Sequence, residues 1–193
     1  VANVAGQHVA GHDAMVVAAF GDPGVAALSE VRDIPVVGLT EAALARASLL
    51  GNRISIIAIS QRIAAWYREC VEQYGMISRL ASIRALNRPI RDIGGVQDEH
   101  ARQLNELCMN AIETDGADVL ILAGAPLAGL ARRIAGGIPV PVVEGVSSAV
   151  RHAETLVGLK PGSARAGSFA PPPAKSHAGL PDPIQRLLEG RWK

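Results

Sequence analysis

The sequence predicts an α/β protein in which parallel strands alternate with helices. Short apolar runs alternate with segments of helical periodicity along most of the 193 residues, which is typical of parallel sheets with right-handed crossovers. Hydrophobic residues make up 49% of the chain and aromatic residues only 3%, so we expect an aliphatic core with helices on both sheet faces. Two strand–turn–helix segments about a hundred residues apart indicate an internal duplication built around a small-molecule site.

Apolar runs predict the strands. Apolar residues at helical spacing, together with residues typical of helix ends, predict the helices. We expect strands at 14–19, 34–38, 53–59, 81–86, 118–123 and 140–143. We expect helices at 24–31, 40–51, 61–75, 94–115, 126–136 and 144–158. Ser60 precedes apolar residues at helical spacing, and Gly75 and Gly116 lie where helices should stop.

The order of the elements predicts how the lobes are assembled. Residues 1–39 together with 144–193 form the first lobe, and residues 40–143 form the second. We expect the first lobe to lack a strand and a helix that would precede Val1. Residues 160–183 are rich in Pro, Gly, Ser and Ala and predict an extended tail over the surface. Residues 183–192 are consistent with a short terminal helix.

The two related turns are the strongest functional signal. Met15–Gly24 and Val119–Leu127 each run from an apolar strand through small residues to a proline, which fits the first position of a helix. Small residues let a ligand approach the backbone, and the amide groups at a helix start favour anions or carbonyl oxygens. The predicted substrate-binding backbone comprises Ala19, Phe20, Gly21, Gly124, Ala125 and Pro126.

Composition argues against several classes of protein. The net charge is +1, and the Lys and Arg residues are scattered, so we expect no nucleic-acid partner. No apolar run reaches the ~20 residues of a membrane span, and no secretory signal is visible. Cys70 and Cys108 lack metal-ligand spacing and are interpreted as packing residues of a cytoplasmic protein. We expect no metal and no cofactor, a small-molecule substrate, and leave open a homo-oligomer.

Four polar residues near predicted strand ends and one histidine two turns into the last long predicted helix are candidates for the site, and each also has a structural interpretation. Asp22 is either a helix cap or a general base. Thr40 and Ser60 are either caps or substrate contacts at the carboxyl ends of strands. Glu144 either complements a helix start or contacts a substrate N–H group. His152 is either structural or a general acid facing the cleft.

The segment Ala18–Gly24, followed by Pro35–Gly38, resembles the hydantoin and allantoin racemase branch of the aspartate/glutamate racemase superfamily. Residues Gly116–Leu122, the Ala123–Ala131 turn and Pro141–Val146 continue the resemblance in order. The resemblance implies two pseudo-symmetric, Rossmann-like α/β lobes with the active site in the cleft between them. It implies cofactor-independent proton exchange at a carbon next to a carbonyl. It also implies one cysteine on each turn, acting as the base or the acid on opposite substrate faces.

The sequence departs from that pattern at both cysteine positions, which Ala19 and Gly124 occupy. Neither side chain can carry a proton, so the two-cysteine mechanism is not supported. The leading hypothesis is a racemase or isomerase acting on an amino-acid-derived, hydantoin or ureido compound, with Asp22, Glu144 and His152 as candidate catalytic residues. The alternatives are a non-catalytic small-anion-binding protein and a one-sided lyase or decarboxylase.

Overall fold

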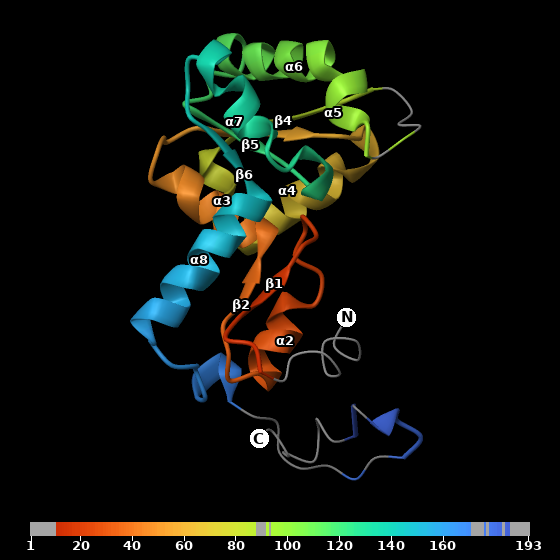
Figure 1. The fold of residues 1–193 in the computed structure, drawn as a ribbon, viewed down its shortest axis with the longest axis vertical. Coiled ribbons are helices and arrows are strands. Elements are labelled where there is room, and N and C mark those ends of the chain that lie inside the picture. Colours follow the sequence, from red (N-terminus) through yellow and green to blue (C-terminus); the bar gives the residue numbers. More distant parts are fainter. Residues whose placement is uncertain are drawn as a thin grey trace.

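The computed structural model describes residues 11–87, 92, 94–170, 176, 178–182 and 184–185. Two parallel sheets lie one above the other (Figure 1). The first pairs β1 (Met15–Val17) with β2 (Val36–Gly38). The second has the order β4-β3-β5-β6, formed by β3 (Ile54–Ala58), β4 (Leu80–Ala85), β5 (Val119–Leu122) and β6 (Val142–Glu144). The predicted α/β class with parallel sheets flanked by helices is therefore confirmed.

Seven α-helices connect and cover these strands in the described part of the chain. They are α2 (Val25–Val31), α3 (Leu39–Ser48), α4 (Ala64–Gln73), α5 (Val96–Glu99), α6 (Ala101–Glu113), α7 (Leu130–Ile134) and α8 (Gly145–Leu159). Short 3₁₀ turns also occur, including η1 (Gln61–Ile63), η3 (Ala125–Leu127) and η4 (Ala135–Gly137).

Three helical predictions need correction. The helix predicted over 94–115 is interrupted at His100, whose φ of −117° and ψ of 17° are not helical. The helix predicted over 126–136 is divided because Gly129 has a φ of 80°, which an α-helix does not accommodate. Pro23 does not begin α2, because Gly24 follows it in the left-handed conformation and the helix starts at Val25.

The second sheet is buried between its helices. Every residue of β3 and β5 is buried, as expected for central strands of a parallel sheet covered on both faces. Phe20, from the first turn, belongs to the core cluster that covers one face of these strands, the face that carries Ile56 and Ile121. None of the helices that the structure describes is long and apolar enough to cross a membrane.

The register of one strand pair in each sheet relates the first turn to the second. Val17 lies opposite Gly38 in the first sheet, and Leu122 lies opposite Glu144 in the second. Ala19 and Gly124 each come two residues after these strand positions, so they are equivalent. Gly38 and Glu144 are equivalent in the same way.

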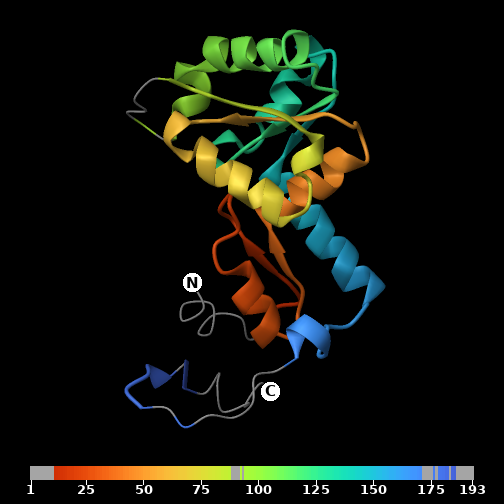
Figure 2. The same ribbon diagram turned by 180° about the vertical axis from the view of Figure 1, so that it is seen from behind.

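The helices that follow β2 and β6 also pack against each other. A Cβ atom added to Gly145 at the start of α8 would lie 2.9 Å from the Cβ of Leu39 at the start of α3. Figure 2 shows α8 leaving the second sheet and running alongside the first. Helix α8 contacts β1 and β2 of the first sheet and also β6 of the second. The lobe boundaries at 39/40 and 143/144 stay a prediction.

The start of the predicted tail lies against the first lobe. Ser163 donates a hydrogen bond to the Asp33 carbonyl (3.1 Å), and Arg165 donates to the carbonyls of Glu30 (3.0 Å) and Arg32 (3.1 Å). Residues 171–175 and most of the predicted terminal helix at 183–192 fall outside the described residues.

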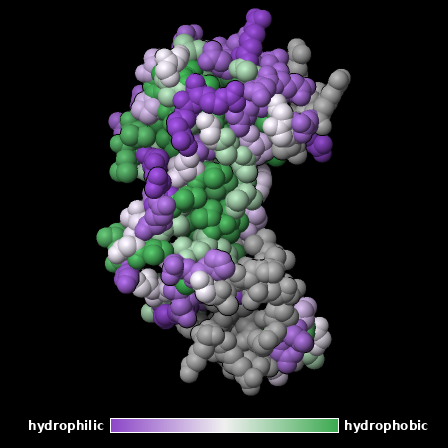
Figure 3. Space-filling view, viewed as in Figure 1, coloured by the Kyte–Doolittle hydropathy of each residue, from purple (hydrophilic) through white to green (hydrophobic). Residues whose placement is uncertain are grey.

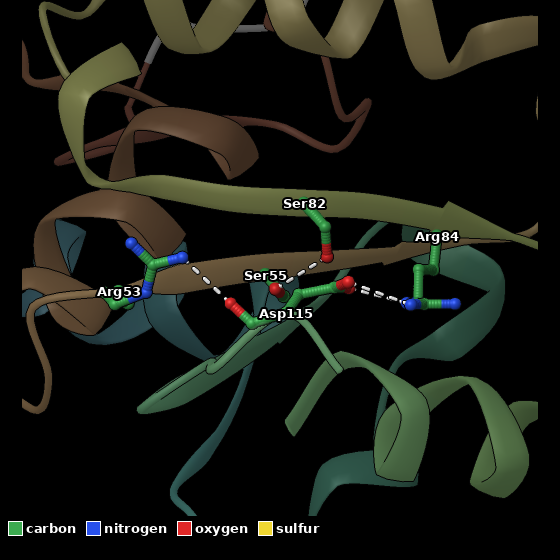
Figure 4. Close-up of polar contacts among 5 residues, drawn as sticks. All are labelled: Arg53, Ser55, Ser82, Arg84 and Asp115. Atoms are coloured by element: carbon green, nitrogen blue, oxygen red, sulfur yellow. Dashed lines mark hydrogen bonds and ion pairs between the residues drawn. The ribbon is translucent and has the colours of Figure 1, made fainter. Parts of the chain in front are cut away.

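A polar network fastens the loop after α6 to the second sheet (Figure 4). The Arg84 guanidinium binds both oxygens of the Asp115 carboxylate, at 2.6 and 2.9 Å. Arg53 donates to the backbone carbonyl of Asp115 (2.8 Å), and the hydroxyls of Ser55 and Ser82 lie 2.8 Å apart. Hydrogen bonding from Arg84 lowers the pKa of Asp115 below its usual value of 3.8. The network therefore favours the ionised carboxylate.

We expect Arg84→Met to lower the free energy of unfolding by about 1 kcal/mol at neutral pH, since it removes a bidentate, partly exposed ion pair. Because the pKa of Asp115 is lower in the folded protein, its ion pair stabilises the fold above pH 3.8. This contribution is lost as the pH falls through the lowered pKa. The difference in the free energy of unfolding between wild type and variant, measured with urea, should therefore become smaller below about pH 4. Arg151→Met, which removes the exposed pair with Glu154, is the control. A difference independent of pH would contradict this account.

Candidate functional site

The first turn is held to α3 by side-chain hydrogen bonds. The Thr40 hydroxyl accepts a hydrogen bond from the Gly21 amide at 2.6 Å. The Asp22 carboxylate accepts from the amides of Thr40 (2.9 Å) and Glu41 (2.8 Å) and from the Tyr74 hydroxyl (2.9 Å). Asp22 is therefore an anionic cap on a helix other than the one that follows it.

These contacts correct the capping interpretations of Asp22 and Thr40. Asp22 does not cap α2, since Gly24 is the residue before that helix and makes no side-chain cap. Thr40 is the second residue of α3, is fully buried, and binds the turn instead. Gly38 makes this geometry possible, because a Cβ atom there would lie 2.2 Å from the Asp22 carboxyl carbon.

The second turn is held differently from the first. Gly124 has a φ of 100° and a ψ of 149°, a conformation open essentially to glycine alone. Pro126 follows inside η3 rather than opening an α-helix, and Leu127 is fully buried. The Gln97 side-chain amide donates to the carbonyls of Pro126 and Ala128, each at 2.9 Å. The second turn is thus held by apolar packing and one glutamine, whereas a carboxylate holds the first.

Both turns meet the aromatic residues of α4. The Phe20 and Tyr67 rings lie 4.7 Å apart between centroids, and Trp66 lies against Gly21, where an added Cβ would be 2.2 Å from its ring. The Tyr67 hydroxyl lies 4.0 Å from the position of a Cβ on Gly124. Figure 2 shows the first turn reaching α4. The two turns therefore share one neighbour, Tyr67.

Tyr67 is the site residue that the sequence analysis missed. Its side chain is 4% exposed, and its hydroxyl makes no hydrogen bond to the described residues. Burial raises the pKa of Tyr67 to about 12, so the phenol is neutral at physiological pH and can donate a hydrogen bond. Helical spacing gave it the appearance of a packing residue, and no local signal marks its approach to Gly124.

Only some of the predicted backbone donors are available. The amide of Ala19 donates to the Val17 carbonyl, and that of Gly21 is taken by Thr40. Pro126 has no N–H group. The amides of Phe20, Gly124 and Ala125 make no hydrogen bond to the described residues. The donors that a ligand can use thus come from both turns, two of them on consecutive residues.

The remaining candidates lie at different distances from the turns. Glu144 ends β6 opposite Leu122 and is 6% exposed. One carboxylate oxygen accepts a hydrogen bond from Ser147, and the other is buried with no hydrogen-bond partner among the described residues. Ser60 accepts a hydrogen bond from the Arg62 amide at 3.3 Å and caps η1. His152 is eight residues further along α8 than Glu144, about 12 Å at the rise of an α-helix.

The two cysteines do not supply the thiols that the turns lack. Cys70 is 4% exposed, and its sulfur lies 3.8 Å from the Gly21 carbonyl; Cys108 is fully buried. Burial raises the pKa of Cys70 and that of Cys108, the latter to about 11. Both thiols are therefore protonated at neutral pH, unlike reactive cysteines.

The arrangement defines a class of protein: a two-lobed α/β protein with pseudo-equivalent turns after equivalent strands. The family model described as Asp/Glu/Hydantoin racemase matches residues 1–153. The hydantoin racemase of Paenarthrobacter aurescens is 38% identical over 167 residues, which are 86% of this chain and 70% of that protein. The chain belongs to the Asp/Glu/hydantoin racemase family.

Solved structures agree with this assignment. Allantoin racemase from Klebsiella pneumoniae has a TM-score of 0.83 and 31% identity, over 96% of this chain and 74% of that one. Allantoin racemase from Pseudomonas fluorescens has a TM-score of 0.78 and 29% identity, over 90% of this chain and 75% of that one. An arylmalonate decarboxylase, at 17% identity and a TM-score of 0.63 over 81% of this chain and 73% of that one, shares the fold.

Proposed function

We propose that the protein is a racemase or isomerase acting on a hydantoin or related ureido compound by cofactor-independent proton transfer at the α-carbon. The observation that carries this proposal is the pair of pseudo-equivalent turns that both lie beside Tyr67, in a chain 38% identical to a hydantoin racemase. We place it in the cytoplasm, because its cysteines, Cys70 and Cys108, are free thiols.

Substrate binding rests on neutral hydrogen-bond donors. A hydantoin ring carries two carbonyl oxygens, and the free amides of Phe20, Gly124 and Ala125 are donors on the two turns. The neutral Tyr67 phenol adds one donor beside Gly124. Such donors stabilise the negative charge that develops on a carbonyl oxygen when the neighbouring carbon loses its proton.

Glu144 is the candidate for moving the proton. No residue in the described part of the chain hydrogen-bonds its second, buried oxygen, whereas both oxygens of Asp22 already accept hydrogen bonds. We therefore assign Asp22 to positioning the first turn. His152 lies about two helical turns from the end of β6 and receives no catalytic role.

A second candidate is ligand binding without catalysis. Ala19 and Gly124 provide no ionisable group on either turn, and this observation favours a binding protein that retains the family scaffold. In that case the same amides and the Tyr67 hydroxyl would bind the ligand, while Glu144 would have only a structural role.

Proton exchange at the α-carbon separates the two candidates. We expect 5-substituted hydantoins in D₂O to lose the α-proton signal in NMR spectra, and Glu144→Gln to slow this exchange by about 100-fold or more. Glu154→Gln on the exposed face of α8 is the matched control. Thermal stabilisation by hydantoins without any exchange would overturn catalysis and leave the binding protein. Unchanged exchange in Glu144→Gln would remove Glu144 from the mechanism.

A further inference from the structure

A cavity of about 450 Å³ lies beside the first lobe, next to residues that hold the first turn. It is bordered by α2, β2, α3, the C-terminal end of α4 and α8, and no residue of either turn lines it. Its volume is within the range of small-molecule pockets. It is formed where the helices of both lobes meet, so its shape depends on how the lobes are packed.

Most of the wall is aliphatic, and the polar groups contribute one carboxylate. The apolar lining is Val25, Ala26, Val36, Val37, Ala42, Ala45 and Leu156. Glu41, Tyr74 and His152 are among the polar lining residues, and no Lys or Arg lines the cavity. Figure 3 shows hydrophobic residues gathered on one face of the molecule at the height of the first sheet. A ligand must therefore combine a hydrocarbon body with a polar group that suits a carboxylate.

The charges around Glu41 favour a cation. Glu41 is an exposed residue that lines the cavity, and partial burial together with the neighbouring Asp22 carboxylate raises its pKa. Asp22 is already bound by two amides and the Tyr74 hydroxyl. His152, which also lines the cavity, makes no hydrogen bond to the described residues, and its Nδ1 is buried. An ammonium group beside Glu41 would relieve the repulsion between the two carboxylates.

We propose that this cavity is a second binding site, separate from the turns, for a small organic ammonium ion with an aliphatic body. The ammonium group binds the Glu41 carboxylate, and the body packs against Val37, Ala42 and Leu156. Because Glu41 and Tyr74 both contact Asp22 through hydrogen bonds, an occupant of the cavity touches the residues that hold the first turn.

Calorimetric titration with three matched probes tests the site. We expect cyclohexylammonium to bind the full chain, while cyclohexanol and cyclohexanecarboxylate, of the same shape, bind at least tenfold more weakly. Glu41→Gln should weaken cyclohexylammonium binding at least tenfold, and Glu154→Gln, on α8 but outside the cavity lining, should leave it unchanged. Leu156→Trp, which fills the cavity from α8, should abolish binding and provides a second test should Glu41→Gln fold poorly.

Several results would overturn the proposal. Cyclohexylammonium would not bind, or cyclohexanol would bind with the same affinity as cyclohexylammonium. Wild-type affinity for cyclohexylammonium in Glu41→Gln or in Leu156→Trp would also contradict the proposal. None of these results depends on hydantoin exchange, so the second site and the proposed function stand or fail separately.

Discussion

Replacing Asp22 by Ala is expected to lower the free energy of unfolding by about 3 kcal/mol or more, a large fraction of the stability of a typical domain. The change removes an anionic acceptor from two amides at the start of α3 and from the Tyr74 hydroxyl. Asp22 is 7% exposed, so water reaches these donors poorly in the variant. Urea unfolding followed by circular dichroism measures the loss.

The matched control is Asp98→Ala, because the Asp98 side chain is 80% exposed and pairs with Arg133 at the surface. We expect it to change the stability by less than about 0.5 kcal/mol. Asp22→Asn is also expected to destabilise, since an amide retains one acceptor and directs an NH₂ group toward N–H donors. Equal stability of Asp22→Ala and Asp98→Ala would show that Asp22 does not hold the first turn.

Restoring a thiol at the two family positions is expected to have unequal effects. Gly124→Cys should lower the free energy of unfolding by about 1–3 kcal/mol, because a φ of 100° with a ψ of 149° is essentially closed to residues with a Cβ atom. Ala19 is half-buried and is not among the residues with positive φ, so Ala19→Cys should be nearly neutral. Thermal unfolding under reducing conditions compares the two variants.

The comparison also tests whether the second turn is adapted to the absence of a side chain. An added Cβ at position 124 meets the Pro126 ring at 3.4 Å and the Tyr67 hydroxyl at 4.0 Å, so space alone does not exclude cysteine. The backbone conformation carries the expected cost. If Gly124→Cys and Ala19→Cys were equally stable, the second turn would be free to carry the family thiol.

The sequence was sufficient for the architecture because the fold depends on patterns that repeat locally. Continuous apolar runs predicted β3 and β5, which are buried throughout, and the two related turns predicted lobes whose strand registers match. Helix continuity was harder to predict. The interruptions at His100 and Gly129 come from backbone conformations that an apolar periodicity does not encode.

The site was predicted less well because its contacts join residues far apart in the chain. Asp22 has the local pattern of a helix cap, yet its partners Thr40, Glu41 and Tyr74 are 18 to 52 residues away. Tyr67 follows the spacing of a core residue, and only the folded chain brings it to Gly124. The backbone donors were predicted as a group, but a side chain or carbonyl already uses the amides of Ala19 and Gly21.

The central claim is that the two turns and Tyr67 form one binding site, and amide chemical shifts during titration with a 5-substituted hydantoin test it most directly. We predict that the amides of Phe20, Gly124 and Ala125 shift together along one saturable curve. Tyr67→Phe should raise the dissociation constant obtained from that curve by about tenfold, because one buried hydrogen bond is lost. Shifts confined to one turn, or none at either turn at saturating hydantoin, would contradict a shared site.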